Sequence, residues 1–220
     1  MGQLVERGIM KVGVLGSGVV AKTLGIGFLQ DGHDVTMGTR DPARLAEWSL
    51  QNPRARIASF AQAAESGELI VLAVKGTAAR EVLAAAASHM EGKTVIDTTN
   101  PFSDAPPVHG VLQFFTPANE SLMERLQREF PKVRLVKAFN SVGNACMVHP
   151  QLTGGKPTMF ICGDDDVAKR TVTEVLVRFG WEVADMGKAE AARPIESLAI
   201  LWCIPGFLQN QWRHAFKLMK

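Results

Sequence analysis

Residues Lys11–Ala21 read KVGVLGSGVVA, and this stretch decides the fold. Its first part, KVGVL, is a short valine-rich apolar run bounded by glycine, which is typical of a buried parallel strand. GSGVVA at Gly16–Ala21 fits the pattern G-x-G-x-x-A, and Val20, Leu24 and Phe28 continue with helical spacing. A glycine turn that follows a strand and opens a helix predicts a dinucleotide-binding βα unit.

The small residues of the turn each have a physical role in such a unit. Gly16 permits the tight turn, Gly18 lets a pyrophosphate approach the backbone, and Ala21 keeps helix and strand close. The helix N-terminus offers free N–H groups and the positive end of its dipole to phosphates. The residues predicted to hold the phosphates are Gly16, Ser17, Gly18, Val19 and Val20.

The stretch GTRDP at 38–42 closes the predicted second strand. An acidic residue here would bind both ribose hydroxyls and repel a 2′-phosphate. Arg40 instead supplies a guanidinium that can pair with a phosphate and stack on adenine, and Thr39 supplies a hydroxyl. Lys22 and Arg44 add positive charge nearby, while Asp41 suits a helix N-cap. The stretch therefore favours NADP over NAD.

Strand and helix patterns alternate along the rest of the chain. The predicted strands are 11–16, 34–40, 55–59, 68–74, 93–100, 133–140, 157–163 and 181–187. Helices are predicted between them, a proline-rich loop over 101–117, and a last helix from 190 onward. This alternation predicts an α/β fold, a Rossmann-type doubly wound parallel sheet over 10–150. A small C-terminal β-α-β-α extension over 151–220 is expected to pack on it.

Composition narrows the classes of function. A net charge of +2, without a basic run interleaved with aromatics, argues against a nucleic-acid partner. Three cysteines without a CxxC pair predict reduced thiols, neither a disulfide framework nor a metal site. The start, MGQLVERGIMK, lacks an apolar signal region, and Glu6 stands where a myristoylation motif has Ser or Thr. The apolar run 198–208 is too short to cross a bilayer, so a cytoplasmic protein is expected.

Beyond the glycine turn, four stretches resemble one family over nearly the whole chain. They are VIDTTNPF at 95–102, LVKAFNSVG at 135–143, FICGDDDVAKRTV at 160–172 and ARPIESLAILW at 192–202. The chain is similar to the coenzyme F-420-dependent NADP reductases, whose NADP-binding fold is shared by the cytoplasmic domain of the STEAP metalloreductases. The resemblance implies hydride transfer between NADPH and a deazaflavin (coenzyme F-420) or flavin-like ring in an adjacent cleft.

The same resemblance implies roles for residues at the ends of three strands. After the fourth strand, the cofactor is implied to contact Ala73, Val74 and Lys75. After the fifth, the nicotinamide is implied to contact Thr99, Asn100 and Pro101. After the sixth, the acceptor is implied to lie beside Ala138, Phe139 and Asn140. Arg193 and Glu196 would hold the last helix to the core, as an ion pair or a cap. Deazaflavin-using members can carry His where this chain has Asn140, so the acceptor stays open. The family also implies a homodimer, with Leu201, Trp202, Ile204, Phe207 and Leu208 as a candidate interface or a cover for the sheet.

No acid–base residue is evident in the sequence. The chain has no tyrosine, which excludes a Tyr-x-x-x-Lys site. His109 and His149 are the only histidines expected near the cleft, and Lys75 is better placed but has no supporting motif. Hydride transfer between two cofactors needs orientation more than proton transfer, so no catalytic side chain is predicted.

Three alternatives to this reductase remain. A dehydrogenase of the 3-hydroxyacid or pyrroline-carboxylate reductase type would need a long helical C-terminal domain, whereas 151–220 reads β-α-β-α. An NADPH-binding redox sensor would bind the cofactor without turnover. A reductase of an unidentified small molecule, ferric iron included, would share the cofactor site but not the acceptor.

Overall fold

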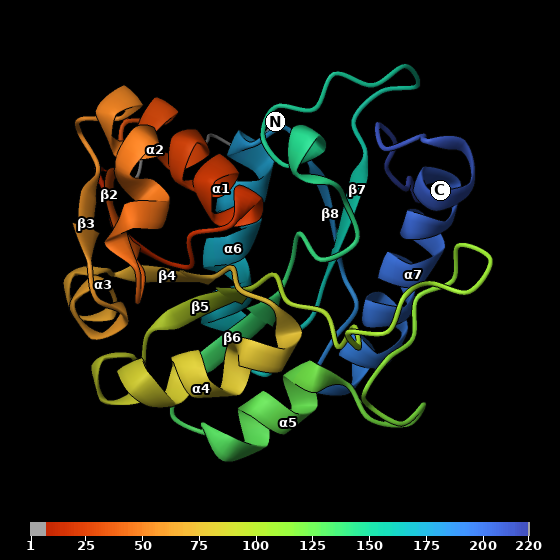
Figure 1. The fold of residues 1–220 in the computed structure, drawn as a ribbon. Helices are drawn as coiled ribbons and strands as arrows, with labels where there is room; N and C mark the ends of the chain where they lie inside the picture. Colours follow the sequence, from red (N-terminus) through yellow and green to blue (C-terminus); the bar gives the residue numbers. More distant parts are fainter. Residues whose placement is uncertain (1–7, 220) are drawn as a thin grey trace.

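The computed structural model describes residues 8–219, so the predictions made on Glu6 and the N-terminal extension fall largely outside the described residues. Its centre is a six-stranded sheet with the order β3-β2-β1-β4-β5-β6 (Figure 1). All neighbouring strands in it pair in parallel. The strands are β1 (Lys11–Leu15), β2 (Asp34–Gly38), β3 (Arg56–Ala58), β4 (Leu69–Leu72), β5 (Thr94–Asp97) and β6 (Arg134–Lys137). This confirms the predicted doubly wound parallel sheet.

Helices cover both faces of the sheet. They are α1 (Val19–Gln30), α2 (Ala46–Gln51), α3 (Phe60–Ser66), α4 (Gly76–Ala86) and α5 (Leu122–Glu129), with short 3-10 turns at Pro42–Leu45 and Ala87–His89. On β4, Leu69 and Val71 face the core that contains α1, whereas Ile70 and Leu72 face the core that contains α3, α4 and α5. The strand order reverses between β1 and β4, which is where such sheets place their ligand.

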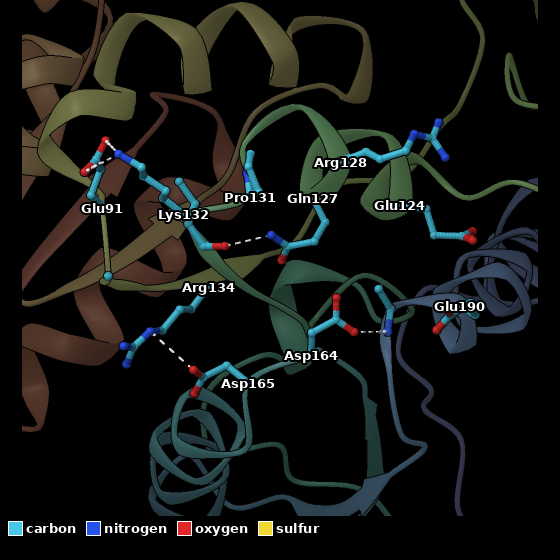
Figure 2. Close-up of a pocket in the computed structure, with 13 residues that line it drawn as sticks. Glu91, Glu124, Gln127, Arg128, Pro131, Lys132, Arg134, Asp164, Asp165 and Glu190 are labelled. Atoms are coloured by element: carbon cyan, nitrogen blue, oxygen red, sulfur yellow. Dashed lines mark hydrogen bonds and ion pairs between the residues drawn. The ribbon is translucent and has the colours of Figure 1, made fainter.

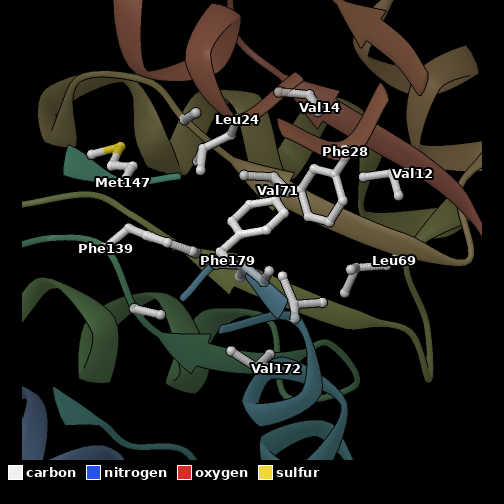
Figure 3. Packing of buried hydrophobic residues seen from close by; sticks show 14 of the residues in the cluster. Val12, Val14, Leu24, Phe28, Leu69, Val71, Phe139, Met147, Val172 and Phe179 are labelled. Carbon is white, nitrogen blue, oxygen red and sulfur yellow. The ribbon is translucent and has the colours of Figure 1, made fainter. Parts of the chain in front are cut away.

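The chain after residue 150 forms β7 (Thr158–Ile161), α6 (Asp166–Arg178), β8 (Glu182–Asp185), a 3-10 turn (Ala189–Ala191) and α7 (Ala192–Gln209). The strands β7 and β8 pair in parallel, and the N–H of Lys137 at the end of β6 donates to Cys162 O at 3.0 Å. Phe179, directly after α6, packs against Phe28 of α1 and Phe139 after β6 (Figure 3). The second part therefore shares its core with the main sheet.

The predicted helix over 42–51 differs in detail, whereas the last helix, predicted from 190 onward, is confirmed. The helix expected over 42–51 begins as a 3-10 turn, with the Asp41 carboxylate accepting a bond from Ala43 N at 3.1 Å. The last helix continues through Pro205 to Gln209. Gly206 permits this ending, because a Cβ there would collide with the ring of Trp212, which folds back on the helix.

The last helix also bears on the prediction that no segment crosses a membrane. Among the described residues, one helical stretch, Ala189–Gln209, is by length and composition apolar enough to do so. It is longer than the run 198–208 judged from the sequence because it begins at Ala189, in the 3-10 turn that leads into α7. Core helices of soluble proteins meet the same criterion but are mostly buried, whereas 33% of this apolar stretch is buried, Trp202 and Cys203 included.

Candidate cofactor site

A cavity of about 600 Å³ lies at the carboxyl ends of β1, β2 and β4. Its lining consists of Gly16, Ser17, Gly18, Val19, Val20, Thr39, Arg40, Asp41, Arg44, Phe60, Ala73, Val74, Lys75, Ala78, Val82 and Thr98. Eleven residues predicted to bind the cofactor are thus brought together: the whole glycine turn, Thr39, Arg40, Arg44 and the stretch 73–75. Lys22, which was expected to add charge nearby, is not part of the lining.

The glycine turn has the geometry that a pyrophosphate requires. Gly16 has a φ of +144°, and its N–H donates to Gly38 O at 2.9 Å. A Cβ at Gly16 would collide with the Ala73 carbonyl, so only glycine fits this close approach of β1 and β4. A Cβ at Gly18 would meet no atom of the protein within 4 Å, so it would project into open space at the cavity. No side chain caps the N-terminus of α1, so its first N–H groups are left for a ligand.

Thr39, Arg40 and Asp41 form the rim of the cavity beyond β2. The Asp41 carboxylate caps the following turn, as predicted, and so is not aimed at a ribose. The Thr39 hydroxyl accepts from Asp41 N and donates to Asp41 O, both at 3.1 Å, so a phosphate would have to replace the second bond. The Arg40 guanidinium, predicted to pair with a 2′-phosphate, donates to Glu81 Oε1 of α4 at 2.9 Å.

Four lining residues, besides the capping Asp41, were not predicted: Phe60, Ala78, Val82 and Thr98. Phe60 opens α3 after a capping box formed by Ser59 and Gln62. Ala78 and Val82 lie one helical turn apart on α4, a spacing that marks one helix face and was visible in the sequence. Thr98 directly follows β5 and donates to Leu72 O at 3.0 Å. Its place at a strand end was the signal that could have identified it.

The residues implied for the nicotinamide and acceptor, Thr99, Asn100, Pro101, Ala138 and Asn140, do not line this cavity. Asn140 is almost fully buried, and its amide donates to Asn100 Oδ1 at 3.1 Å and to Ile195 O at 2.9 Å. Asn100 returns a bond to Asn140 O at 2.8 Å. The ends of β5 and β6 are thus joined to each other. The contacts occupy the NH2 group of the amide expected to face an acceptor ring, whereas its buried Oδ1 has no hydrogen-bond partner among the described residues.

The turn after β6 is held in an unfavourable backbone conformation. Phe139 has a φ of +61° and is buried. A bulky residue in the left-handed region is strained, and such strain persists only where the surrounding structure imposes it. The chain bends at Phe139, and Asn140, the next residue, bonds Asn100. Ala138, on the other side of Phe139, is fully buried and donates its N–H to Asp97 O.

A cluster of charged groups lies behind this strand end. Lys137 Nζ lies 2.7 Å from Asp97 Oδ2 and 2.9 Å from Glu196 Oε1, and it donates to Thr99 O at 2.8 Å. The three side chains are excluded from solvent. Burial lowers the pKa of Lys137, but the two carboxylates outweigh it and raise that pKa above the usual value. Sequence reasoning missed Asp97 and Lys137, although a charge at the end of an apolar strand was a visible signal.

Arg193 and Glu196 fasten the last helix to the core, as the resemblance implied. The Glu196 carboxylate accepts from Leu122 N at 2.9 Å and Met123 N at 3.1 Å, which caps the N-terminus of α5. Arg193 Nε donates to Glu124 Oε2 at 2.9 Å. Burial raises the pKa of Glu124, but its bonds to Arg193 and Ser121 outweigh burial and lower it to about 2.

Few side chains around the cavity could act as a general acid or base. Lys75 lies at its edge with its amine 3.6 Å from Asp104, and both are well exposed. His109 and His149 do not line the cavity; His149 packs against Phe179. Within residues 8–219, no group of three His, Cys, Asp or Glu side chains could hold a metal ion.

A second hollow, of about 810 Å³, lies where β5 and β6 begin, at the opposite edge of the sheet (Figure 2). Two ion pairs lie within its lining: Lys132 pairs with Glu91 at 3.0 Å, and Arg134 pairs with Asp165 at 3.3 Å. None of the predicted cofactor residues lies in it. The smaller cavity at the carboxyl ends is therefore the candidate site.

The sheet and this cavity are those of a Rossmann-type dinucleotide-binding domain. Residues 11–101 match the family model described as NADP oxidoreductase coenzyme F420-dependent. A crystal structure from Arthrobacter sp. FB24, described as a "putative f420 dependent nadp-reductase", is 33% identical with a TM-score of 0.89, and the alignment covers 96% of this chain and all of that one. The chain belongs to the coenzyme F420-dependent NADP oxidoreductase family.

More distant relatives share parts of this similarity. Metalloreductase STEAP3 of Rattus norvegicus is 31% identical over 93% of this chain, which spans 40% of that protein's length. A reductive aminase from Aspergillus terreus, solved in complex with NADPH, has a TM-score of 0.67 at 18% identity, covering 92% of this chain and 64% of its own. At that identity the aminase shows a shared fold alone.

Proposed function

We propose that the protein transfers a hydride between NADP(H), held in the 600 Å³ cavity, and a deazaflavin (coenzyme F-420) or flavin-like acceptor. The observation that carries the proposal is the position of Gly18, which faces open space beside the uncapped N-terminus of α1. A phosphate can approach the backbone only where no side chain intervenes. When bound, the nicotinamide would supply the hydride chemistry.

The residues of the site divide into three groups under this proposal, of which the first two line the cavity. The turn 16–20 and the start of α1 hold the pyrophosphate, while Arg40 and Arg44 hold a 2′-phosphate. Phe60 and Val82 supply apolar surface that excludes water around the adenosine half. Thr99, Asn100 and Pro101 border the nicotinamide from the far side, and Ala138 and Asn140 shape the acceptor pocket through their packing.

The proposal requires no general acid or base from the chain. Among the lining residues, Asp41 is engaged as a cap and Lys75 is an exposed edge residue paired with Asp104. Transfer between two rings depends on how the protein stacks them and keeps water out, and not on a proton relay. A dehydrogenase acting on an alcohol would need such a relay.

We also propose that the protein works as a cytoplasmic homodimer with a small-molecule acceptor, independent of nucleic acid and membrane. Three apolar residues of α7 expose more than two fifths of their surface: Leu201, Phe207 and Leu208. An exposed apolar patch of this kind favours contact with a second copy of the chain. Trp202 is buried against the tail of its own chain and would not take part. Sedimentation velocity would test the dimer; a single monomer species at micromolar concentration would contradict it.

The test of the function is anaerobic stopped-flow mixing of protein and NADPH with coenzyme F-420, and separately with FMN, followed by nicotinamide absorbance. Fast oxidation with one acceptor, and slower oxidation when NADH replaces NADPH, is expected. Tight NADPH binding without oxidation by any deazaflavin, flavin or quinone would contradict the reductase and favour the redox sensor. A matched run without protein corrects for direct reaction between the two reagents.

A further inference from the structure

The Arg40–Glu81 ion pair joins two walls of the cofactor cavity. Arg40 follows β2 on one side, and Glu81 lies on α4, between the lining residues Ala78 and Val82. The distance from Arg40 Nη1 to Glu81 Oε1 is 2.9 Å. The two residues are 41 positions apart in the chain, so folding alone brings them together. The pair therefore spans the rim at the place where the proposed site needs a guanidinium.

The pair is suited to exchange its partner. Both side chains are 69% exposed, so water and salt screen their attraction and the bond breaks easily. Glu81 is the only carboxylate paired with Arg40 within residues 8–219. A phosphate monoester carries more charge than a carboxylate and presents three acceptor oxygens to a guanidinium. A 2′-phosphate would therefore displace Glu81 from Arg40.

We infer that Glu81 is a specificity-determining residue that competes with the 2′-phosphate of the cofactor for Arg40. The inference rests on the proposed NADP site. Glu81 acts twice against that phosphate, because it must be displaced first and then stays beside it as a like charge. A cofactor without the 2′-phosphate leaves the Arg40–Glu81 pair intact and meets neither cost. Glu81 thereby moderates the preference for NADP that Arg40 creates.

The inference predicts whether removing the charge of Glu81 raises or lowers the affinity for a 2′-phosphate. Glu81→Gln keeps the shape of the side chain and removes its charge, so adenosine 2′,5′-bisphosphate is expected to bind about two- to five-fold tighter, the range that weak exposed pairs allow. Binding of 5′-AMP, which lacks the 2′-phosphate, is expected to stay unchanged. If Glu81 instead oriented Arg40 for the phosphate, the same variant would bind the bisphosphate more weakly.

The matched control is Glu129→Gln. Glu129 also pairs with an exposed arginine of α4, Arg80, at 2.7 Å, and it does not line the cavity. The control changes the net charge by the same amount, so a general electrostatic effect would appear in both variants. Titration calorimetry of wild type and both variants with the two probes gives the comparison directly, without any redox turnover.

Each outcome decides a different point. Tighter binding of the bisphosphate by Glu81→Gln alone supports the inference. A wild type that prefers the bisphosphate, together with a Glu81→Gln variant that equals or falls below Glu129→Gln, overturns the role of Glu81 and leaves the cofactor site standing. Equal binding of both probes by wild type overturns the proposed NADP site, and the role of Glu81 with it.

Discussion

Two groups of charged side chains lie at the carboxyl ends of the sheet, and they differ in almost every physical respect. Arg40 and Glu81 form one exposed contact at the rim of the cavity. Asp97, Lys137 and Glu196 form a cluster excluded from solvent behind the ends of β5 and β6. Exposed pairs contribute up to about 1 kcal/mol and exchange partners freely. Buried charges are costly to separate, so they hold the elements that carry them in one arrangement.

The difference separates the two halves of the candidate site. The adenosine end is bordered by a pair that a ligand can open. The opposite end is built on Thr99, whose carbonyl accepts from Lys137 and whose hydroxyl and N–H bond Asp97 at 2.7 and 2.9 Å. We expect substitutions at the adenosine end to change the selectivity for the cofactor. At the end built on Thr99, we expect the backbone geometry to be fixed.

The largest effect is expected from Lys137→Met. This variant leaves Asp97 and Glu196 buried without a counter-ion, which destabilises a protein by about 3–5 kcal/mol. Urea unfolding followed by circular dichroism measures the change in the free energy of unfolding. If the variant does not fold, Glu196→Gln, which keeps one ion pair, is expected to unfold at a lower urea concentration than wild type. A loss below about 1 kcal/mol for Lys137→Met would show that the buried cluster is no stronger than an exposed pair.

The next effect is expected from Arg40→Ala at the exposed end. The loss of a charged hydrogen-bond donor to a phosphate costs about 1.5–3 kcal/mol of binding, or about 10- to 100-fold in Kd for NADPH. The free energy of unfolding is expected to change by less than about 0.5 kcal/mol, because the side chain is exposed. Fluorescence titration with NADPH and NADH measures the two affinities. Equal losses for both cofactors would contradict a role in holding the 2′-phosphate.

The smallest effect concerns Glu124, whose contact with Arg193 is intermediate between the two groups. The pKa of Glu124 is lowered to about 2 from an ordinary 4.5, so its ionised form stabilises the fold above pH 4.5. That stabilisation is lost as the pH falls from 4.5 towards 2. Because Arg193 is 41% exposed, we discount the effect for screening to about 1–2 kcal/mol.

Urea unfolding at pH 5 and pH 3 tests this linkage. Wild type is expected to lose more stability between these values than Glu124→Gln, which cannot titrate at this position. Glu129→Gln, which removes an exposed carboxylate, serves as the control. Equal acid sensitivity of Glu124→Gln and wild type would show that the Arg193 contact is no different from an exposed pair.

Local patterns in the sequence predicted the fold and eleven of the sixteen residues that line the cavity. The glycine turn, the strands beside it and the Asp41 cap depend on residues close together in the chain, and the structure places them as expected. Asn100 and Asn140 were both assigned to the site, but their amides bond each other instead of lining the cavity. The bend at Phe139, directly before Asn140, has no signature in the sequence, because its φ of +61° is imposed by the packing around it.

The sequence by itself determined a parallel α/β sheet, a phosphate-binding turn and a guanidinium in place of the acid that selects NAD. These features follow from short-range periodicity, glycine geometry and the charge of a single residue. Only the tertiary structure decided that Arg40 meets Glu81, that Lys137 is shared by Asp97 and Glu196, and that Phe60 and Val82 complete the cavity. Such pairings join distant segments, and they are set by how helices and strands pack together, which no local pattern encodes.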